Sequence, residues 1–260
     1  MITIVDINVA DIREKSIFRS ERTSQALFNE QVEILSEENE YTKVRQHDGY
    51  EGWILKTALL EIDRFRGDGP FKVVNNFSHA FRTPDRNSKR ITSIPYGCEL
   101  YGEDSGEFLK IKSNRYGPIF IEKSNLNPHI GKAMDSQTIK SLFKSETEKF
   151  LSVPYLWGGR SFFGIDCSGF CQTIMRRFNI ELPRDSKDQM NDGVEVARED
   201  IELGDLLFYP GHVAAALSND QFIHSSSSNG GVAVNSFDKE SPVYSENLDK
   251  IFITARRVIG

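Results

Sequence analysis

One cysteine stands out among the residues that could do chemistry, because its neighbours are small and polar. Cys167 lies in the stretch GGRSFFGIDCSGF, between Asp166 and Ser168. A cysteine kept for packing usually sits among apolar residues, where it behaves as a small hydrophobe. The run CSGFCQTIMRRF predicts a helix that begins at this cysteine. The positive end of a helix favours the thiolate, which is the nucleophilic form. We therefore expect Cys167 to be a nucleophile.

Two histidines are candidates for the base that such a thiol needs. His212 follows the turn Pro210–Gly211 at the start of one predicted strand, and His224 lies on the next strand. With a short SND turn between paired strands, the two rings would lie side by side. One imidazole would take the proton from Cys167, and the other would bind its far nitrogen and fix its tautomer.

Simpler explanations exist for each of these residues taken alone. A histidine at a strand end is often only a hydrogen-bonded polar residue, and Asp166 can cap the helix with its carboxylate. Cys171 lies one helical turn after Cys167, next to apolar residues, and is expected to be an inert core thiol. The functional hypothesis therefore depends on the combination of residues and not on any single one.

Composition excludes several classes of function. The chain of 260 residues has a net charge of −6, whereas nucleic-acid binding needs a basic face. No run of 18 apolar residues occurs, so no membrane span is expected. The three cysteines lack the spacing of a zinc site and the five histidines are scattered, so we expect no metal and no cofactor. The first residues lack the pattern of a secretory signal, which predicts a cytoplasmic protein, or an exported one if a signal was trimmed.

The first half of the chain contains an internal repeat. Tyr41–Leu59 aligns without gaps with Phe108–Leu126, so that Trp53 aligns with Phe120. Both copies show short alternating apolar runs broken by Gly, Asp and Asn, a pattern typical of strands in a small all-β unit. The repeat predicts one all-β domain over residues 1–62 and a second over residues 70–127.

The second half of the chain has a different pattern. Residues 128–137 are rich in turn formers and predict a linker, after which Asp135 or Ser136 can cap a helix. From residue 205 onward the chain reads as strands, over DLLFY, HVAAAL, QFIHSS, GVAVNSF and IFITARRV. Residues 138–260 are therefore expected to form an α+β domain, with helices first and an antiparallel sheet after them.

The motifs together resemble a known family. PYLWGG, DCSGF, LPRDS, GHVA and FIHSS occur in this order, as in the NlpC family of bacterial cell-wall cysteine peptidases, which are papain-like hydrolases. The resemblance covers about Thr138 to Val258. It implies that Cys167 is the nucleophile, His212 the base and His224 the orienting residue.

The resemblance also implies how the reaction is stabilised and what precedes the catalytic domain. The Tyr155 hydroxyl and the Cys167 backbone N–H would stabilise the oxyanion. DGYEGWI and YGPIFI resemble bacterial SH3-like barrels, although Pro118 and Phe120 replace the acidic residue and the tryptophan in the second copy. The expected architecture is an α+β papain-like catalytic domain preceded by two small all-β SH3-like barrels.

Family members with such barrels resemble γ-D-glutamyl-L-diamino acid endopeptidases, which release L-Ala-γ-D-Glu from peptidoglycan stem peptides whose N-terminal amine is free. This implies a role in recycling peptidoglycan-derived peptides. Asp166 is expected to pair with the substrate ammonium group, and Glu51 or Asp48 of the first barrel are candidates for a further acid. The residues that match the substrate-binding pattern are Tyr155, Trp157, Asp166, Ser168, Asp185 and Ser186.

Three other functions remain open from the sequence. The first is an endopeptidase that cuts intact murein and is anchored by its barrels. The second is a wall-binding module without activity, which is disfavoured because no member of the Cys-His-His set is missing. The third is an acyltransferase or amidase on the same fold. The sequence also leaves open whether the substrate contains diaminopimelate or lysine.

Overall fold

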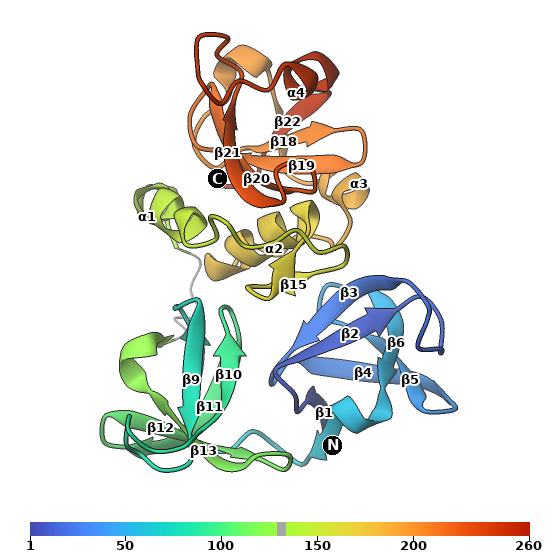
Figure 1. The fold of residues 1–260 in the computed structure, drawn as a ribbon, viewed down its shortest axis with the longest axis vertical. Helices are drawn as coiled ribbons and strands as arrows, with labels where there is room; N and C mark the ends of the chain where they lie inside the picture. The colour runs from blue at the N-terminus through green and yellow to red at the C-terminus, as the bar shows by residue number, and fades with distance from the viewer. Residues whose placement is uncertain (129–133) are drawn as a thin grey trace. The chain divides into compact units, whose positions relative to one another are not determined.

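The computed structural model describes residues 1–128 and 134–260, and the chain divides into two compact units, Met1–Ile130 and Gly131–Gly260 (Figure 1). The predicted linker 128–137 falls at this division, and its residues 129–133 lie outside the described residues. Its last residues already belong to the second unit, because helix α1 (Ser136–Glu148) begins there. Asp135 caps this helix as predicted, since its carboxylate accepts the Thr138 N–H at 2.8 Å.

The N-terminal unit consists of two antiparallel sheets of seven strands each. The first sheet contains β1 (Ile2–Val5), β2 (Val9–Arg13), β3 (Arg22–Leu27), β4 (Gln31–Glu38), β5 (Tyr41–Arg45), β6 (Glu51–Leu55) and β7 (Leu59–Ile62). The second contains β8 (Asp68–Val73), β9 (Phe77–Phe81), β10 (Arg90–Pro95), β11 (Glu99–Ser105), β12 (Phe108–Ser113), β13 (Gly117–Glu122) and β14 (Leu126–Pro128).

The repeat in the sequence corresponds to a repeat in the structure. The first sheet has the strand order β3-β2-β6-β5-β4-β1-β7, and the second has the same order in its own strands, β10-β9-β13-β12-β11-β8-β14. A short 3₁₀ helix follows the sixth strand in both, η1 at Lys56–Ala58 and η2 at Lys123–Asn125, and the sequence repeat aligns these two helices residue for residue. Trp53 and Phe120 thus occupy equivalent strands.

The two sheets are joined by packing as well as by the chain. Leu27, the last residue of β3, and the adjacent Phe28 belong to the apolar core of the second sheet, where Phe28 is only 1% exposed. Arg115 of the second sheet donates its backbone N–H to the Asp6 carboxylate at 2.9 Å and its guanidinium to the Thr57 carbonyl at 2.7 Å. These contacts explain why residues 1–128 form one compact unit.

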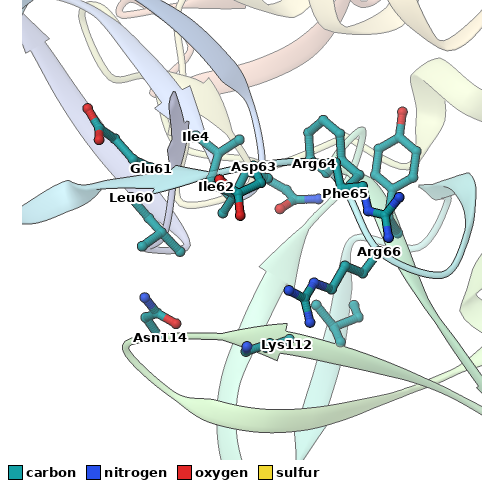
Figure 2. Close-up of a pocket in the computed structure, with 13 residues that line it drawn as sticks. Ile4, Leu60, Glu61, Ile62, Asp63, Arg64, Phe65, Arg66, Lys112 and Asn114 are labelled. Atoms are coloured by element: carbon teal, nitrogen blue, oxygen red, sulfur yellow. The ribbon is translucent and has the colours of Figure 1, made fainter. Parts of the chain in front are cut away.

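A cavity of about 230 Å³ lies in this unit beside the segment that joins the two sheets (Figure 2). Its apolar floor includes Ile4 and Ile111, which are almost fully buried. Charged side chains of both signs surround it, among them Asp63, Arg66 and Lys112. The joining segment thus exposes its charged residues, while its Phe65 ring stacks on the Tyr101 ring of β11 with the centroids 4.1 Å apart.

The C-terminal unit combines helices with a six-stranded antiparallel sheet of order β17-β22-β18-β19-β20-β21. After α1 come β15 (Arg160–Ser161), β16 (Gly164–Ile165), α2 (Cys167–Arg177), α3 (Ser186–Gln189), β17 (Val194–Val196), η3 (Arg198–Asp200), β18 (Leu206–Tyr209), β19 (His212–Ala216), β20 (Gln221–Ser226), β21 (Gly231–Ser236), α4 (Glu246–Ile251) and β22 (Thr254–Arg257). The five strands expected after residue 205 are all present. The elements α3, α4 and β17 were not predicted from the sequence.

Helix α2 is the buried helix of this unit. It packs against β19 and β20, and its apolar face of Phe170, Ile174 and Phe178 is at most 1% exposed. The Phe170 ring also meets the Phe150 ring edge to face at 5.6 Å. Burial on several sides fixes the position of α2, and therefore of the cysteine at its first residue.

Phe28 provides a test of how the two N-terminal sheets are joined. We expect Phe28→Ala to lower the free energy of unfolding of this unit by about 3–5 kcal/mol, because a fully buried ring leaves a cavity. Phe18 is 75% exposed, so Phe18→Ala is the matched control and should change stability little. Urea denaturation of both variants checks this expectation, and equal stability losses would contradict it.

Candidate active site

Cys167 is the first residue of α2 and lies against the sheet. Its side chain is almost buried, with 6% of the residue exposed. Asp166 caps the helix, since its Oδ1 accepts the Gly169 N–H at 2.7 Å. Gly169 follows in the first turn of the helix. In the structure a Cβ at Gly169 would collide with the Gly159 carbonyl, so this glycine serves close packing within the chain.

The carboxylate of Asp166 is engaged on both oxygens by the protein itself. Arg184 binds it in a bidentate pair, with Nη2–Oδ2 at 2.6 Å and Nη1–Oδ1 at 3.1 Å. Gly158 donates its N–H to Oδ2 at 2.8 Å, and the Ser168 hydroxyl lies 3.3 Å from Oδ1 and accepts from Arg184 at 2.8 Å. The side chains of Arg184 and Asp166 are 1% and 7% exposed.

This buried network corrects the substrate roles expected for two residues. Asp166 was expected to bind a substrate ammonium group, but its carboxylate already neutralises a buried guanidinium and caps a helix. Ser168 was expected to contact substrate, but its hydroxyl accepts a hydrogen bond from the same Arg184. The geometry therefore gives both residues a structural role in holding Cys167.

The two candidate histidines lie side by side, as the strand pattern predicted. His212 Nε2 is 2.7 Å from His224 Nδ1, across the neighbouring strands β19 and β20. His224 is 2% exposed, and its Nε2 lies 2.8 Å from Oδ1 of Asn235 on β21. The strands thus align three side chains in a row, in the order His212, His224, Asn235.

Burial sets the charge state of these groups. It lowers the pKa of His212 to about 3, with a smaller effect from the neighbouring His224, and it also lowers the pKa of His224. Burial raises the pKa of Cys167 to about 11, and the charge of Asp166 adds to this. The backbone N–H groups of Val213 and Ser168 point to the sulfur and act in the opposite direction, but they are outweighed.

Burial therefore favours an uncharged thiol and a neutral imidazole, whereas the helix start alone favours the thiolate. A neutral imidazole can still act as a general base, because it takes the proton while the sulfur attacks. The arrangement can perform nucleophilic acyl transfer without a charged pair in the free enzyme.

Tyr155 is held near Cys167 by a segment that runs along β21. The Tyr155 N–H donates to the Gly230 carbonyl at 3.1 Å, and the Val232 N–H donates to the Val153 carbonyl at 2.9 Å. Burial raises the pKa of Tyr155 to about 12, and the nearby Cys167 and Asp166 add to this, so the phenol stays protonated. Among residues 1–128 and 134–260 its hydroxyl makes no hydrogen bond, which leaves it as a donor beside the thiol.

Asp185 and Ser186 lie immediately after Arg184, at the start of α3. This helix packs against α2, where the Gln189 side chain donates to the Ser168 carbonyl at 3.1 Å. Asp185 is half-buried, and burial raises the pKa of its carboxyl. Within the described parts of the chain, its carboxylate has no hydrogen-bond or ion-pair partner. It is therefore available to a ligand, unlike Asp166.

The other candidate substrate-binding residues differ in their exposure and in the hydrogen bonds that their side chains already make within the protein. Trp157 is 57% exposed, one residue before Gly158. In the N-terminal unit, Glu51 accepts from Lys43 at 2.8 Å and from Arg45 at 2.7 Å, and Asp48 accepts the Tyr50 N–H at 3.0 Å. Glu51 is thus paired within its own sheet. No group of His, Cys, Asp and Glu side chains that could hold a metal ion occurs in residues 1–128 and 134–260.

Two residues of the site were not predicted from the sequence. Arg184 lies in the motif LPRDS, but an arginine in a polar run is usually a surface residue, so its burial became evident only from its pair with Asp166 in the structure. For Asn235, the only indication of a role is its position relative to His224 in the paired strands. His224 pairs with Ala233, and Asn235 is two residues further along the same face, within diagonal reach of His224. That signal requires the strand register, which the sequence did not supply.

Comparison with known proteins now identifies the fold around this site. The model of the NlpC/P60 family matches residues 152–251, a range that contains Tyr155, Cys167, both histidines and Asn235. The chain belongs to the NlpC/P60 family. It is therefore a cysteine peptidase, a hydrolase, as the sequence predicted. A second model, the bacterial dipeptidyl-peptidase Sh3 domain, matches residues 12–59, so the NlpC/P60 domain is preceded by an SH3-like domain.

Related proteins extend this assignment. Dipeptidyl-peptidase 6 of Lysinibacillus sphaericus is 26% identical over 95% of this chain and 96% of its own length. Gamma-D-glutamyl-L-lysine dipeptidyl-peptidase of Bacillus cereus is 28% identical over 78% of this chain and 66% of its own length. The crystal structure of an NlpC/P60 family protein from Bacillus cereus has a TM-score of 0.85 at 20% identity and covers all of both chains, which shows a common fold.

No helix in the described parts of this NlpC/P60 protein is long and apolar enough to cross a membrane.

The buried pair of Asp166 and Arg184 can be tested by removing its cation. We expect Arg184→Met to lower the free energy of unfolding by about 3–5 kcal/mol, because it leaves a buried carboxylate without a partner. Lys250 forms an exposed pair with Glu246, so Lys250→Met is a control that should have little effect. Urea denaturation measures both, and a mild effect at Arg184 would mean that water or another group solvates Asp166.

The charge state of the resting thiol can be tested by alkylation. With a pKa of about 11, the rate of Cys167 alkylation by iodoacetamide should rise about tenfold per pH unit through neutral pH, as the thiolate fraction does. Tandem mass spectrometry at each pH assigns the modification to Cys167 by its fragment ions and so separates it from Cys171 in the same peptide and from Cys98. A rate that stays constant from about pH 5 to 8 would instead reveal a preformed thiolate–imidazolium pair.

Proposed function

We propose that this protein hydrolyses the bond between γ-D-Glu and the L-diamino acid in peptidoglycan stem peptides whose N-terminal amine is free, releasing L-Ala-γ-D-Glu. The observation that carries this proposal is the half-buried Asp185 carboxylate, which has no partner among the described residues and lies next to the network that holds Cys167. An unpaired carboxylate beside a nucleophile suits a substrate with an ammonium group close to the bond that is cut.

The proposed reaction assigns each step to one residue. Cys167 attacks the γ-carbonyl of D-Glu while His212 takes the thiol proton, which gives a tetrahedral oxyanion. The Tyr155 hydroxyl and the Cys167 N–H donate hydrogen bonds to that oxyanion, and a donor of this kind is typically worth about 3–4 kcal/mol of barrier. The intermediate collapses as the diamino acid leaves with the proton from His212. Water then attacks the thioester, with His212 as base, and regenerates the thiol.

Asp185 would select the free amine. A carboxylate that loses water on substrate binding gains a charge-assisted hydrogen bond from an ammonium group. An amide in the same place, as in intact murein, is neutral and would leave that charge unpaired, so the site should reject it strongly. The ammonium role that the sequence assigned to Asp166 thus passes to Asp185, while Ser186 and the exposed Trp157 remain candidates for further contacts.

The relatives support the reaction class and the substrate. Two of them are named dipeptidyl-peptidases, one of them for the γ-D-glutamyl-L-lysine bond. We also propose that the second sheet is a second SH3-like barrel, because its strand order repeats that of the first, and that the catalytic domain is an α+β papain-like domain. A role in recycling wall peptides follows from the preference for a free amine, and a cytoplasmic location stays a prediction.

Peptide hydrolysis tests this proposal. We expect the protein to cleave free L-Ala-γ-D-Glu-diaminopimelate. The same peptide acetylated at its N-terminus should be cleaved at a rate at least about 100-fold lower. Mass spectrometry identifies the products, and the lysine analogue beside it reports the preferred diamino acid. Cys167→Ala should abolish cleavage without changing the unfolding curve.

Three results would contradict parts of the proposal. Equal cleavage of both peptides would favour an enzyme that acts on intact murein, which purified sacculi would confirm. Cleavage of neither would favour an acyltransferase or amidase. Asp185→Asn that keeps the full preference for the free amine would assign the ammonium group to another residue, whereas Asp188→Asn is the matched exposed control.

A further inference from the structure

The strand β21 places a side chain in contact with the histidine pair that no sequence motif pointed to. We propose that Asn235 is a positioning residue that fixes which nitrogens of His224 and His212 carry hydrogen, and so keeps one nitrogen of His212 ready to accept a proton. The inference rests on the proposed role of His212 as the base. It concerns a residue that touches neither the thiol nor, in the proposed reaction, the bond that is cut.

The orientation of the Asn235 amide is fixed by a neighbour that can only accept. Its Nδ2 lies 3.0 Å from the Val243 carbonyl, and a backbone carbonyl has no hydrogen to donate. Oδ1 must therefore be the atom that faces His224, at 2.8 Å from Nε2. Asn229 agrees with this assignment, since its Nδ2 donates to the same Oδ1 at 2.7 Å.

This orientation propagates through both rings. Because Oδ1 only accepts, His224 Nε2 must carry a hydrogen, and a neutral His224 then has an unprotonated Nδ1. That Nδ1 lies 2.7 Å from His212 Nε2, so His212 Nε2 carries a hydrogen in turn. The lone pair of His212 is left at Nδ1. On the same strand, the next N–H along, that of Val213, points to the Cys167 sulfur.

The opposite pattern of hydrogens would disable the base. It would protonate His212 Nδ1 and turn the lone pair of His224 Nε2 toward Asn235 Oδ1, which sets two acceptors against each other. A buried acceptor without a donor is costly, and His224 is 2% exposed. The ring of Tyr209, 5.8 Å from that of His212, does not alter this balance, because burial raises its pKa and keeps it neutral.

A spectroscopic experiment tests the proposal without any substrate. In ¹H–¹⁵N spectra of the full chain with labelled histidines, we expect both His212 and His224 to be unprotonated at Nδ1. Asn235→Leu, which has similar volume and no polar atoms, should yield a mixture of tautomers. Asn229→Ala removes one donor to the same Oδ1 but leaves the contacts of Asn235 with Val243 and His224, so it should keep the wild-type pattern.

Kinetics with the free stem peptide provide the second readout. We expect Asn235→Leu to lower kcat about tenfold with KM almost unchanged, because the ready tautomer becomes less populated. Asn235→Asp places a carboxylate beside His224, which favours the imidazolium form. The acid limb of its kcat/KM profile should therefore move to higher pH, because the histidine pair then becomes protonated at a higher pH and the base is lost there. Asn229→Ala should stay within about threefold of wild type.

The outcomes separate this proposal from its alternatives. Unchanged tautomers in Asn235→Leu would overturn it. So would an Asn235→Asp variant whose maximum kcat/KM falls while the pH of its acid limb stays the same. Equal defects in the Asn229 and Asn235→Leu variants would show that loop packing, and not the amide, is responsible. If the peptide is not a substrate at all, the proposed function fails, yet the spectra still decide the role of Asn235. Thermal unfolding of each variant confirms that it is folded.

Discussion

The site depends on one buried ion pair. Asp166 and Arg184 lie in different segments, and their bidentate contact brings the start of α2 to the segment before α3. The same carboxylate accepts the N–H groups of Gly158 and Gly169, so it also fixes the turn after Tyr155. Three pieces of chain that carry the thiol, the phenol and the unpaired Asp185 thereby share one anchor. Loss of either charge leaves the other buried and unsolvated, which makes the anchor all-or-none.

Burial that holds the site together also sets its chemistry. In a site that excludes water, the uncharged forms of thiol and imidazole are favoured, so the proton moves only when a substrate arrives to stabilise the new charge. Hydrogen bonds in such surroundings are strong and directional. In the row Asn235, His224 and His212, each buried hydrogen bond can be donated in one direction only. Preorganised donors and acceptors then replace the charged pair as the source of reactivity.

Much of this protein follows from its sequence. The internal repeat predicted the two equivalent sheets, because alternating apolar strands with matching turns fold alike. Local patterns placed the strands after residue 205, the Asp135 cap and the pairing of His212 with His224, since short turns and helix starts depend on neighbouring residues. The family assignment by DCSGF and GHVA is confirmed.

The parts that the sequence did not yield depend on contacts distant along the chain. Arg184 reads as a surface residue until its buried partner is known, and this is why Asp166 was given a substrate role. Asn235 reaches His224 only through the register of β20 and β21. The thiol pKa could not be derived from the sequence for a related reason: the helix start is local, whereas the burial that outweighs it comes from tertiary packing.

Trapping the covalent intermediate tests the role of Cys167 most directly. The protein is mixed with L-Ala-γ-D-Glu-diaminopimelate, quenched in acid within milliseconds, digested and examined by mass spectrometry. We expect fragment ions to place an L-Ala-γ-D-Glu adduct on Cys167, with none on Cys98 or Cys171 and none from the N-acetylated peptide. Hydrolysis of the peptide with no adduct on Cys167, or an adduct on another residue, would contradict nucleophilic attack by this thiol.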